Sequence, residues 1–224
     1  MIEIFYKTIP FFALIGLGYS AAITRFFSAE ATAYLTKFVF YFALSAMLFR
    51  FSSDLSLSEL YDPEFIYAYL SASLIIYFLA TAVAIFRKKV PSEAAVEAQC
   101  SVIGNVGFLG IPMLAILMGP KSVGFIMIIL AIDLIVFGSL IVLIIVASKD
   151  KKLDIFLFYR VLLGLMKNPM IVSIICGLLW SASGWSIPGP INDFIVMLGS
   201  AATPGALFAI GASLAQKSTE RFEV

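Results

Sequence analysis

The stretch Glu97-Ala-Gln-Cys-Ser-Val-Ile-Gly-Asn-Val-Gly-Phe-Leu-Gly-Ile-Pro-Met-Leu-Ala-Ile-Leu117 decides the fold. It is long and apolar enough to cross a bilayer, yet glycines, an asparagine and a proline occupy its middle. Because proline lacks an amide N–H and its ring collides with the preceding turn, we expect the helix to break near Gly110–Pro112. A bilayer tolerates such a break only where protein or a water-lined cavity covers the unpaired backbone groups. The alternative is a kinked helix whose small residues allow close packing.

A broken membrane helix has a chemical use. Its two halves leave free N–H groups at one end and free C=O groups at the other, near the middle of the bilayer. Many secondary transporters bind an anionic solute and a coupling cation at such ends. The stretch from Glu97 to Leu117 therefore indicates a transporter.

The composition is that of a bundle of membrane helices. The chain has 224 residues, of which 62% are hydrophobic and 13% charged, and its mean hydropathy is +1.04. Its 15 basic and 14 acidic residues nearly balance, so the charge does not indicate nucleic-acid binding. The sequence has no histidine and no acidic pair at a catalytic spacing, so we expect neither an enzyme nor a metal or cofactor site. Cys100 and Cys176 lie in apolar runs and are expected to be small buried residues.

Seven segments meet the criterion of about 20 mostly apolar residues for a membrane span. They lie near Ile4–Ile23, Tyr34–Phe51, Phe65–Phe86, Ala94–Met118, Ser122–Ala147, Pro169–Trp185 and Ile191–Ala215. Between the fifth and the sixth, Lys149–Lys167 has the mixed pattern of a short helix on the membrane surface. Asp193 is expected to cap the N-terminus of the seventh. Lys and Arg number three on one side and twelve on the other, which predicts a plasma or inner cell membrane protein with its N-terminus outside and its C-terminal tail cytoplasmic.

The chain also carries an internal repeat of low identity. A shift of 159 residues superimposes identical residues without a gap: Pro10 on Pro169, Ile15 on Ile174, Gly18 on Gly177, Ala43 on Ala202, Leu48-Phe49 on Leu207-Phe208, and Leu55 on Leu214. Five spans separate the two copies, so the first and sixth spans run in opposite directions. The repeat is therefore predicted to be inverted, as in many transporters.

Three motifs in this order resemble the auxin efflux carrier family, which includes plant PIN transporters and bacterial permeases for malonate and other organic anions. They are Asn105-Val-Gly-Phe-Leu-Gly-Ile-Pro112, Asn168-Pro169, and Ala202-Thr-Pro-Gly-Ala-Leu-Phe-Ala-Ile-Gly-Ala-Ser-Leu214. The resemblance implies an all-α integral membrane fold of ten helices in two inverted five-helix repeats, related to sodium–proton exchangers and bile-acid symporters. Helices 1, 2, 6 and 7 would form a scaffold, and helices 3 to 5 and 8 to 10 a transport domain in which helices 4 and 9 cross. Scaffolds of this kind can pair, which implies a homodimer.

The sequence departs from that pattern because it ends soon after its seventh span. We expect residues 1–148 to form the first repeat, 149–167 a cytoplasmic or interfacial linker, and 168–224 the start of the second repeat, with its last three helices missing. The chain is then either a fragment of a longer reading frame, which we favour, or a short protein that must assemble with something else.

Candidate substrate-binding residues gather in the fourth span. They are Asn105, Gly107, Gly110, Ile111 and Pro112, with the amides of Gly110 and Ile111 expected to face an anion. The alternative for Asn105 is a hydrogen bond that holds two helices together.

Asp133 lies in the otherwise uncharged run Ile126–Val146. An ionised carboxylate at that depth is costly, so it should face a cavity, pair with a cation or take up a proton. We expect a coupling proton or sodium ion there, and the alternative is a protonated carboxyl hydrogen-bonded to a neighbouring helix. Pro204 and Gly205 interrupt the seventh span and are expected either to line the transport path or to form a simple kink.

These observations predict a secondary carrier that moves a small organic anion across a lipid bilayer by alternating access. A sodium-coupled symporter of related fold, an accessory membrane subunit and a non-functional fragment are the alternatives. The identity of the solute is not readable, because capture by backbone dipoles is chemically generic.

Overall fold

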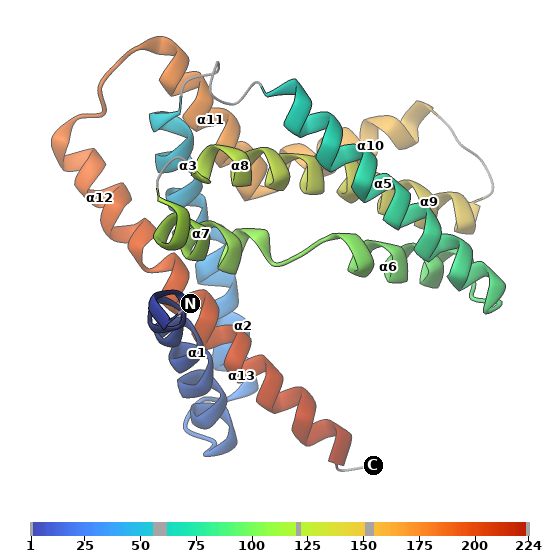
Figure 1. The fold of residues 1–224 in the computed structure, drawn as a ribbon, viewed down its shortest axis with the longest axis horizontal. Helices are drawn as coiled ribbons and strands as arrows, with labels where there is room; N and C mark the ends of the chain where they lie inside the picture. Colours follow the sequence, from blue (N-terminus) through green and yellow to red (C-terminus); the bar gives the residue numbers. More distant parts are fainter. Residues whose placement is uncertain (1, 56–61, 120–121, 151–154, 223–224) are drawn as a thin grey trace.

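The computed structural model describes residues 2–55, 62–119, 122–150 and 155–222, and the regular secondary structure of these residues consists of helices joined by short irregular segments (Figure 1). The α-helices are α1 (Ile2–Ile23), α2 (Ala29–Phe38), α3 (Leu44–Asp54), α5 (Pro63–Phe86), α6 (Pro91–Val102), α7 (Ile111–Met118), α8 (Ser122–Ile132), α9 (Gly138–Asp150), α10 (Ile155–Met166), α11 (Pro169–Ser183), α12 (Gly189–Ser200) and α13 (Ala202–Phe222). Three π-helical segments directly precede α3, α7 and α9: η1 (Val39–Ala43), η2 (Val106–Gly110) and η3 (Asp133–Phe137).

Most of the expected membrane spans are present. Five helical segments of the described chain are long and apolar enough to cross a membrane: Ile4–Ile23, Ala29–Asp54, Pro63–Phe86, Ser122–Ile145 and Gly189–Gln216. They correspond to the first, second, third, fifth and seventh expected spans. The sixth is the 15-residue α11, and the fourth is interrupted. The prediction of an all-helical, multi-pass membrane protein is therefore confirmed.

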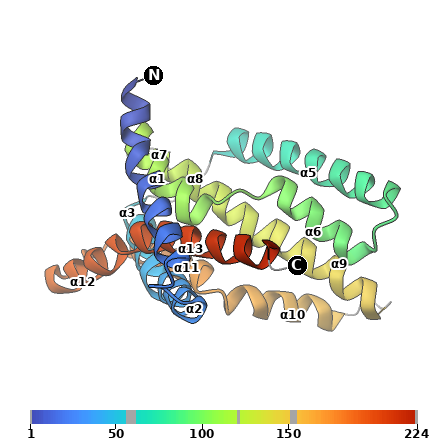
Figure 2. The same cartoon turned by 90° about the horizontal axis from the view of Figure 1, so that it is seen from below.

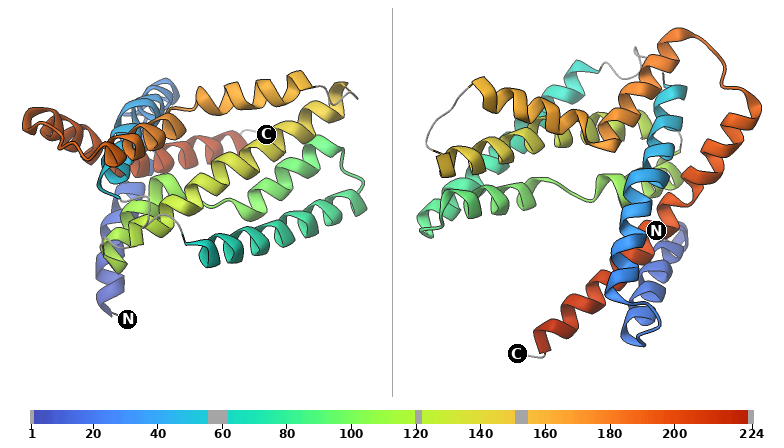
Figure 3. Two further views of the ribbon diagram at one scale, coloured as in Figure 1. Left: turned by 90° about the horizontal axis from the view of Figure 1, so that it is seen from above. Right: turned by 180° about the vertical axis from the view of Figure 1, so that it is seen from behind.

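The helices form two groups. In the first, α1 packs along α13, while α3 packs along α11 and α12. In the second, α5 packs against α6, which also contacts α9. Figures 1 and 2 show the second group extending to one side of the first, with α10 beside α9, and the views in Figure 3 show the same division.

An N-cap residue followed by a proline marks the start of two of the spans. Asp62 accepts a hydrogen bond from the amide of Phe65 at 3.0 Å, and Pro63 occupies the first turn of α5. Asn168 does the same for the amide of Met170 at 3.0 Å, with Pro169 in the first turn of α11. Proline is tolerated there because its missing N–H would have no helical partner, and the Asx side chain satisfies a neighbouring one.

Glycines bring the helices of the first group into backbone contact. A Cβ added at Gly18 would overlap the carbonyl oxygen of Phe208, and one added at Gly177 would lie 2.6 Å from the carbonyl oxygen of Phe49. The two glycines are 159 positions apart, and so are the two phenylalanines. The α1–α13 contact and the α11–α3 contact therefore use equivalent positions of the repeat seen in the sequence.

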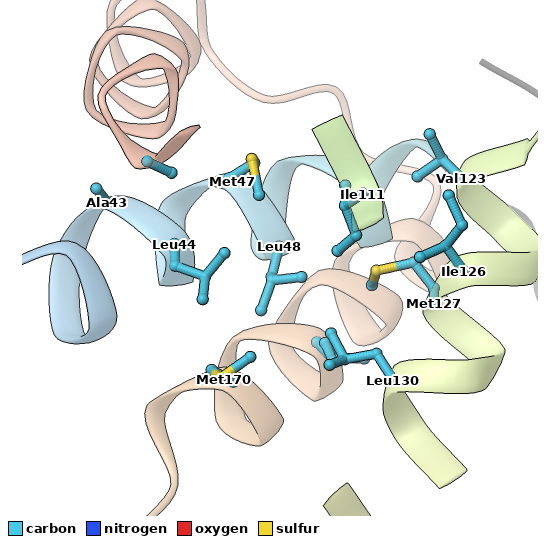
Figure 4. Close-up of a cluster of buried hydrophobic side chains, with 12 residues drawn as sticks. Ala43, Leu44, Met47, Leu48, Ile111, Val123, Ile126, Met127, Leu130 and Met170 are labelled. Carbon is cyan, nitrogen blue, oxygen red and sulfur yellow. The ribbon is translucent and has the colours of Figure 1, made fainter. Parts of the chain in front are cut away.

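A cluster of buried side chains joins the first group to α8, which continues through η3 into α9 of the second group (Figure 4). Leu44, Met47 and Leu48 of α3 face Val123, Ile126, Met127 and Leu130 of α8. The other members of the cluster are Ala43, Ile111, Met170, Ile174 and Ala202. Leu44, Leu48 and Ile111 are fully buried. Through this cluster α7, and with it the broken fourth span, packs against the first group.

Three local expectations need correction. Asp193 does not cap the seventh span, because α12 already begins at Gly189 with Pro190 in its first turn, which leaves Asp193 exposed within the helix. The interruption of that span lies at Ala201, between α12 and α13, so Pro204 and Gly205 fall in the first turn of α13. Cys100 and Cys176 are free but exposed rather than buried.

Candidate functional site

The fourth span is broken between α6 and η2. Helix α6 ends at Val102, and the backbone of Ile103 is extended, with φ −84° and ψ 119°. Asn105, with φ −81° and ψ 62°, is also non-helical, and helical structure resumes at Val106 and continues through η2 and α7 to Met118. Figure 1 shows this interruption as an irregular green segment between α6 and α7.

The break lies several residues before Gly110–Pro112, where the sequence led us to expect it. The amide of Gly110 donates to the carbonyl of Asn105 at 2.9 Å, and the amide of Ile111 donates to the carbonyl of Val106. Both bonds reach back five residues, which is the π-helical pattern. The wider turn carries the chain into α7 with Pro112 in its first turn, where a missing N–H costs little.

The same bonds correct the expectation that the Gly110 and Ile111 amides are free. Unpaired groups lie at the break instead. Among the described residues, the amides of Gly104 and Val106 have no acceptor, and Gly104 is exposed. Asn105 caps the resumed helix, since its Oδ1 accepts from the amide of Phe108 at 3.3 Å. The end of this helical segment therefore presents backbone N–H groups and an exposed asparagine.

A pocket touches the resumed fourth span at Phe108, and we call it the η2 pocket. It has a volume of about 210 Å³ and lies between η2, the α2–η1 span and α13. Its lining is mostly apolar, with two hydroxyl residues: Thr36, Val39, Phe108, Ala206, Ala209, Ile210, Ser213 and Leu214. Gly205 packs beside it, because a Cβ added there would lie 2.8 Å from Cγ2 of Val39. Gly205 thus sits next to this pocket, and Pro204, one residue earlier in α13, is exposed.

Asp133 is the only charged residue that is buried among the described residues, with 3% of its surface exposed. It begins η3, and its Oδ1 accepts a hydrogen bond of 2.8 Å from the hydroxyl of Tyr69 in α5. Its Oδ2 is buried and has no hydrogen-bond partner in the described part of the chain. The carboxyl is thus half satisfied by a helix outside its own span, and one of its oxygens remains available to a further group.

Tyr69 was missed in the sequence, although a signal was present. Tyr69, Ser73, Tyr77 and Thr81 recur every four residues and so form one stripe along α5. Ser73 and Tyr77 are 5% and 1% exposed. A polar stripe at helical spacing in a membrane span indicates a face turned to other helices rather than to lipid.

The break and Asp133 belong to the same part of the second group. Tyr77, Ala98 and Phe137 form a buried cluster, against which both Ile103 of the break and Ile132, the neighbour of Asp133, pack. Two further buried atoms in α5 and α6 have no partner among the described residues, the Tyr77 hydroxyl and Oε1 of Gln99. Gly107 is buried, and a Cβ added there would lie 3.1 Å from Cε of Met170.

Glu97 does not join this set. It pairs with Arg87 at 2.9 Å, and its side chain is 37% exposed. The pair ties the end of α5 to α6, and exposed pairs of this kind contribute little to stability.

Comparison with known proteins identifies the family. The sequence profile described as "Membrane transport protein" matches residues 3–222. Among curated proteins, "Putative malonate transporter" of Rhizobium meliloti (strain 1021) is 27% identical over 223 residues, a match that covers 99% of this chain and 70% of the relative. The profile spans nearly the whole chain, and it corresponds to the family that the motifs around Asn105 and Pro169 resemble. The chain therefore belongs to the membrane transport protein family of auxin efflux carriers, and it is a membrane transporter rather than an enzyme.

Proposed function

We propose that the protein carries a small organic anion and that the anion binds where the fourth span is broken. The observation that carries this proposal is the helix end at Gly104–Val106, whose amides lack acceptors among the described residues. The η2 pocket touches the same helical segment at Phe108. Helix N-termini attract anions through free N–H groups and the helix dipole. Asn105 adds a side-chain amide that can donate to a carboxylate oxygen. The name of the Rhizobium relative, which specifies malonate, supports a carboxylate as the solute.

The proposal includes alternating access in an inverted-repeat fold. Support comes from the packing of α1 on α13 and of α11 on α3, because exchanging the two copies of the repeat converts one contact into the other. The first group of helices would be the scaffold and the second group the transport domain, with the fourth span as its crossover helix. Residues 1–148 and 168–224 would then belong to successive repeats, joined by the segment 149–167.

Asp133 is the proposed coupling site. Its unpaired Oδ2 has the chemistry to take up a proton or to contribute to a sodium site with the neighbouring hydroxyl of Tyr69. The positive-inside rule supports an N-terminus outside a plasma or inner membrane, with the α5–α6 turn in the cytoplasm. That turn carries Arg87, Lys88 and Lys89.

Uptake of radiolabelled malonate into proteoliposomes that contain the full 224-residue chain tests the proposal. Wild-type vesicles should accumulate malonate above protein-free vesicles, and Asn105→Ala should lower the uptake about tenfold or more, as loss of a hydrogen bond to a charged group implies. Asn192→Ala, a partly buried asparagine in α12, is the matched control and should leave uptake unchanged. Equal uptake by both variants would remove Asn105 from the site, and no uptake by the wild type would overturn the proposal.

The coupling ion is identified from the gradient dependence of malonate uptake in the same vesicles. Sodium and pH gradients are imposed separately, and each is compared between wild type and Asp133→Asn. Dependence on one gradient in the wild type and on neither in Asp133→Asn is the expected result. Uptake by Asp133→Asn with an unchanged dependence on the gradient would exclude Asp133 from coupling.

A further inference from the structure

A second pocket, which we call the Arg50 pocket, lies among α3, α7, α12 and the start of α13. Its volume is about 350 Å³, and most of its lining is apolar. The polar residues in it are Arg50, Ser200 and Thr203. Arg50 lies one turn before the end of the second span, Ala29–Asp54. A cation at that place in a membrane helix is a candidate for ligand binding.

The two pockets occupy equivalent places in the repeat. Four lining residues of the Arg50 pocket lie 159 positions from lining residues of the η2 pocket: Ile195 from Thr36, Met47 from Ala206, Arg50 from Ala209, and Phe51 from Ile210. Both pockets also touch the resumed fourth span, the η2 pocket through Phe108 and the Arg50 pocket through Ala115 and Ile116. They therefore flank the two ends of the same helical segment, and each is lined by residues of both repeat copies.

Arg50 has donors that the protein leaves unused. Its Nη1 donates to Oδ2 of Asp54 one turn further along α3, while its Nε is buried and has no acceptor among the described residues. A guanidinium presents five N–H groups in a planar fork that matches a carboxylate. Because Asp54 takes Nη1 and Nε is buried, Nη2 is left for a second carboxylate. The side chain is 32% exposed, so it is not locked in the core.

We propose that the Arg50 pocket is the outer capture site for the carboxylate of the transported solute. This inference rests on the proposed function, because it takes its orientation and its solute from it. The guanidinium binds the incoming carboxylate through Nη2 and keeps Asp54 as a second partner. The hydroxyls of Ser200 and Thr203 and the apolar wall of Met47 and Phe51 accept the rest of a small solute.

Comparison of the two equivalent pockets predicts a difference in solute capture between the two sides of the membrane. The position of Arg50 is taken by Ala209 in the η2 pocket, which no described Lys or Arg lines. A carboxylate is therefore attracted by the guanidinium of Arg50 on the outer side and by hydroxyls and backbone dipoles on the inner side. The carrier should capture the solute at lower concentration from outside than from inside.

Cysteine reactivity in sided membrane vesicles tests the site. In a background of Cys100→Ser and Cys176→Ser, the variant Ser200→Cys places a thiol in the Arg50 pocket, and Ser213→Cys places one in the η2 pocket. Two membrane-impermeant methanethiosulfonates are applied from outside, one carrying a sulfonate and one a trimethylammonium group. The thiol of Ser200→Cys should react from outside and should favour the anionic reagent, whereas that of Ser213→Cys should react only from inside.

The arginine is then removed. Arg50→Gln should lower the ratio of anionic to cationic reaction rates at Ser200→Cys about tenfold, because a full charge beside the thiol is lost. Arg50→Lys should retain most of the ratio, which separates charge from folding. Lys37→Gln removes a charge from the other end of the same span and is the matched control, expected to leave the ratio unchanged. A ratio that does not respond to Arg50→Gln would overturn the proposal.

Protection by malonate identifies the ligand. Malonate should slow labelling of Ser200→Cys, and the concentration for half protection should rise about 10- to 100-fold in Arg50→Gln. Vesicles of phosphatidylcholine alone and with phosphatidylglycerol separate a solute from a lipid headgroup: protection by the anionic lipid without malonate would assign the site to lipid and overturn the capture role. Malonate uptake that depends on Asn105 but neither protects Ser200→Cys nor responds to Arg50→Gln would defeat this inference alone. Protection without any uptake would defeat the proposed function alone.

Discussion

Substitution of Tyr69 by Phe isolates one hydrogen bond at the buried carboxyl of Asp133. The change removes only a hydroxyl, which donates to Oδ1 at 2.8 Å, and it leaves the ring in place. Oδ2 already lacks a partner among the described residues, so the variant leaves both oxygens of a residue that is 3% exposed without a donor. Leaving a buried acceptor unsatisfied costs about 1–3 kcal/mol, and more for a charged one. We expect Tyr69→Phe to lower the free energy of unfolding by about 2 kcal/mol.

Tyr67→Phe is the matched control for this prediction. Tyr67 lies two residues earlier on α5 and is 73% exposed, so loss of its hydroxyl should change stability by less than about 0.5 kcal/mol. Unfolding is followed by far-ultraviolet circular dichroism as dodecyl sulfate is titrated into mixed micelles that contain each variant. A double-mutant cycle with Asp133→Asn then gives the coupling between the two side chains, expected at about 1–3 kcal/mol. Equal losses in the two tyrosine variants, or additive effects in the cycle, would refute the reasoning.

Three further predictions concern the glycines and one cap. Gly18→Ala should destabilise the protein by about 1–3 kcal/mol, because its Cβ would overlap the carbonyl of Phe208, whereas Gly16→Ala, with nothing within 4 Å, should be neutral or slightly stabilising in the same micelle titration. Gly119→Ala meets no neighbour, yet it should cost about 1–3 kcal/mol, because φ +86° with ψ 174° is a region reserved for glycine; an unchanged midpoint would contradict this. Asn168→Ala should cost about 1 kcal/mol and speed amide exchange at Met170, since it removes the cap of α11, and unaltered exchange would show that the cap is dispensable.

The span pattern could be predicted because it depends on local properties. Hydropathy over about 20 residues locates a membrane helix whatever surrounds it, and the prolines at 63 and 169 mark helix starts for steric reasons that need no tertiary context. The existence of a break in the fourth span followed from its composition in the same way. The position of the break could not be predicted, because the π-helical turn η2 places Pro112 in the first turn of α7 without a break in the helix. Whether such a turn forms depends on how Ile111 and Gly107 pack against α3, α8 and α11.

The site residues also differ in whether local sequence or tertiary packing reveals them. Asp133 stands out in the sequence because it is a carboxyl in an uncharged run, and the structure places it in the core. Its partner Tyr69 lies 64 residues earlier, and the pairing depends on the rotation of α5 against α8, which periodicity narrows to a stripe but does not fix. The exposure of Cys100 and Cys176 could not be predicted from the sequence for a related reason, because an apolar run in a membrane protein can face lipid as well as the core.

Two kinds of helix contact coexist in this molecule, and they differ in what a movement would cost. Within the first group, Gly18 and Gly177 press helix backbone against backbone, so any rotation of α1 on α13 or of α11 on α3 drives main-chain atoms together. Between the groups, the contact is made by side chains such as Met47, Met127 and Met170. Methionine side chains are unbranched and exchange rotamers readily, and a small displacement there is met by repacking rather than by collision. In the alternating access that we propose, the two groups therefore move against each other at this cluster, where Met47 also lines the Arg50 pocket. The glycine contacts within the scaffold stay intact during that movement.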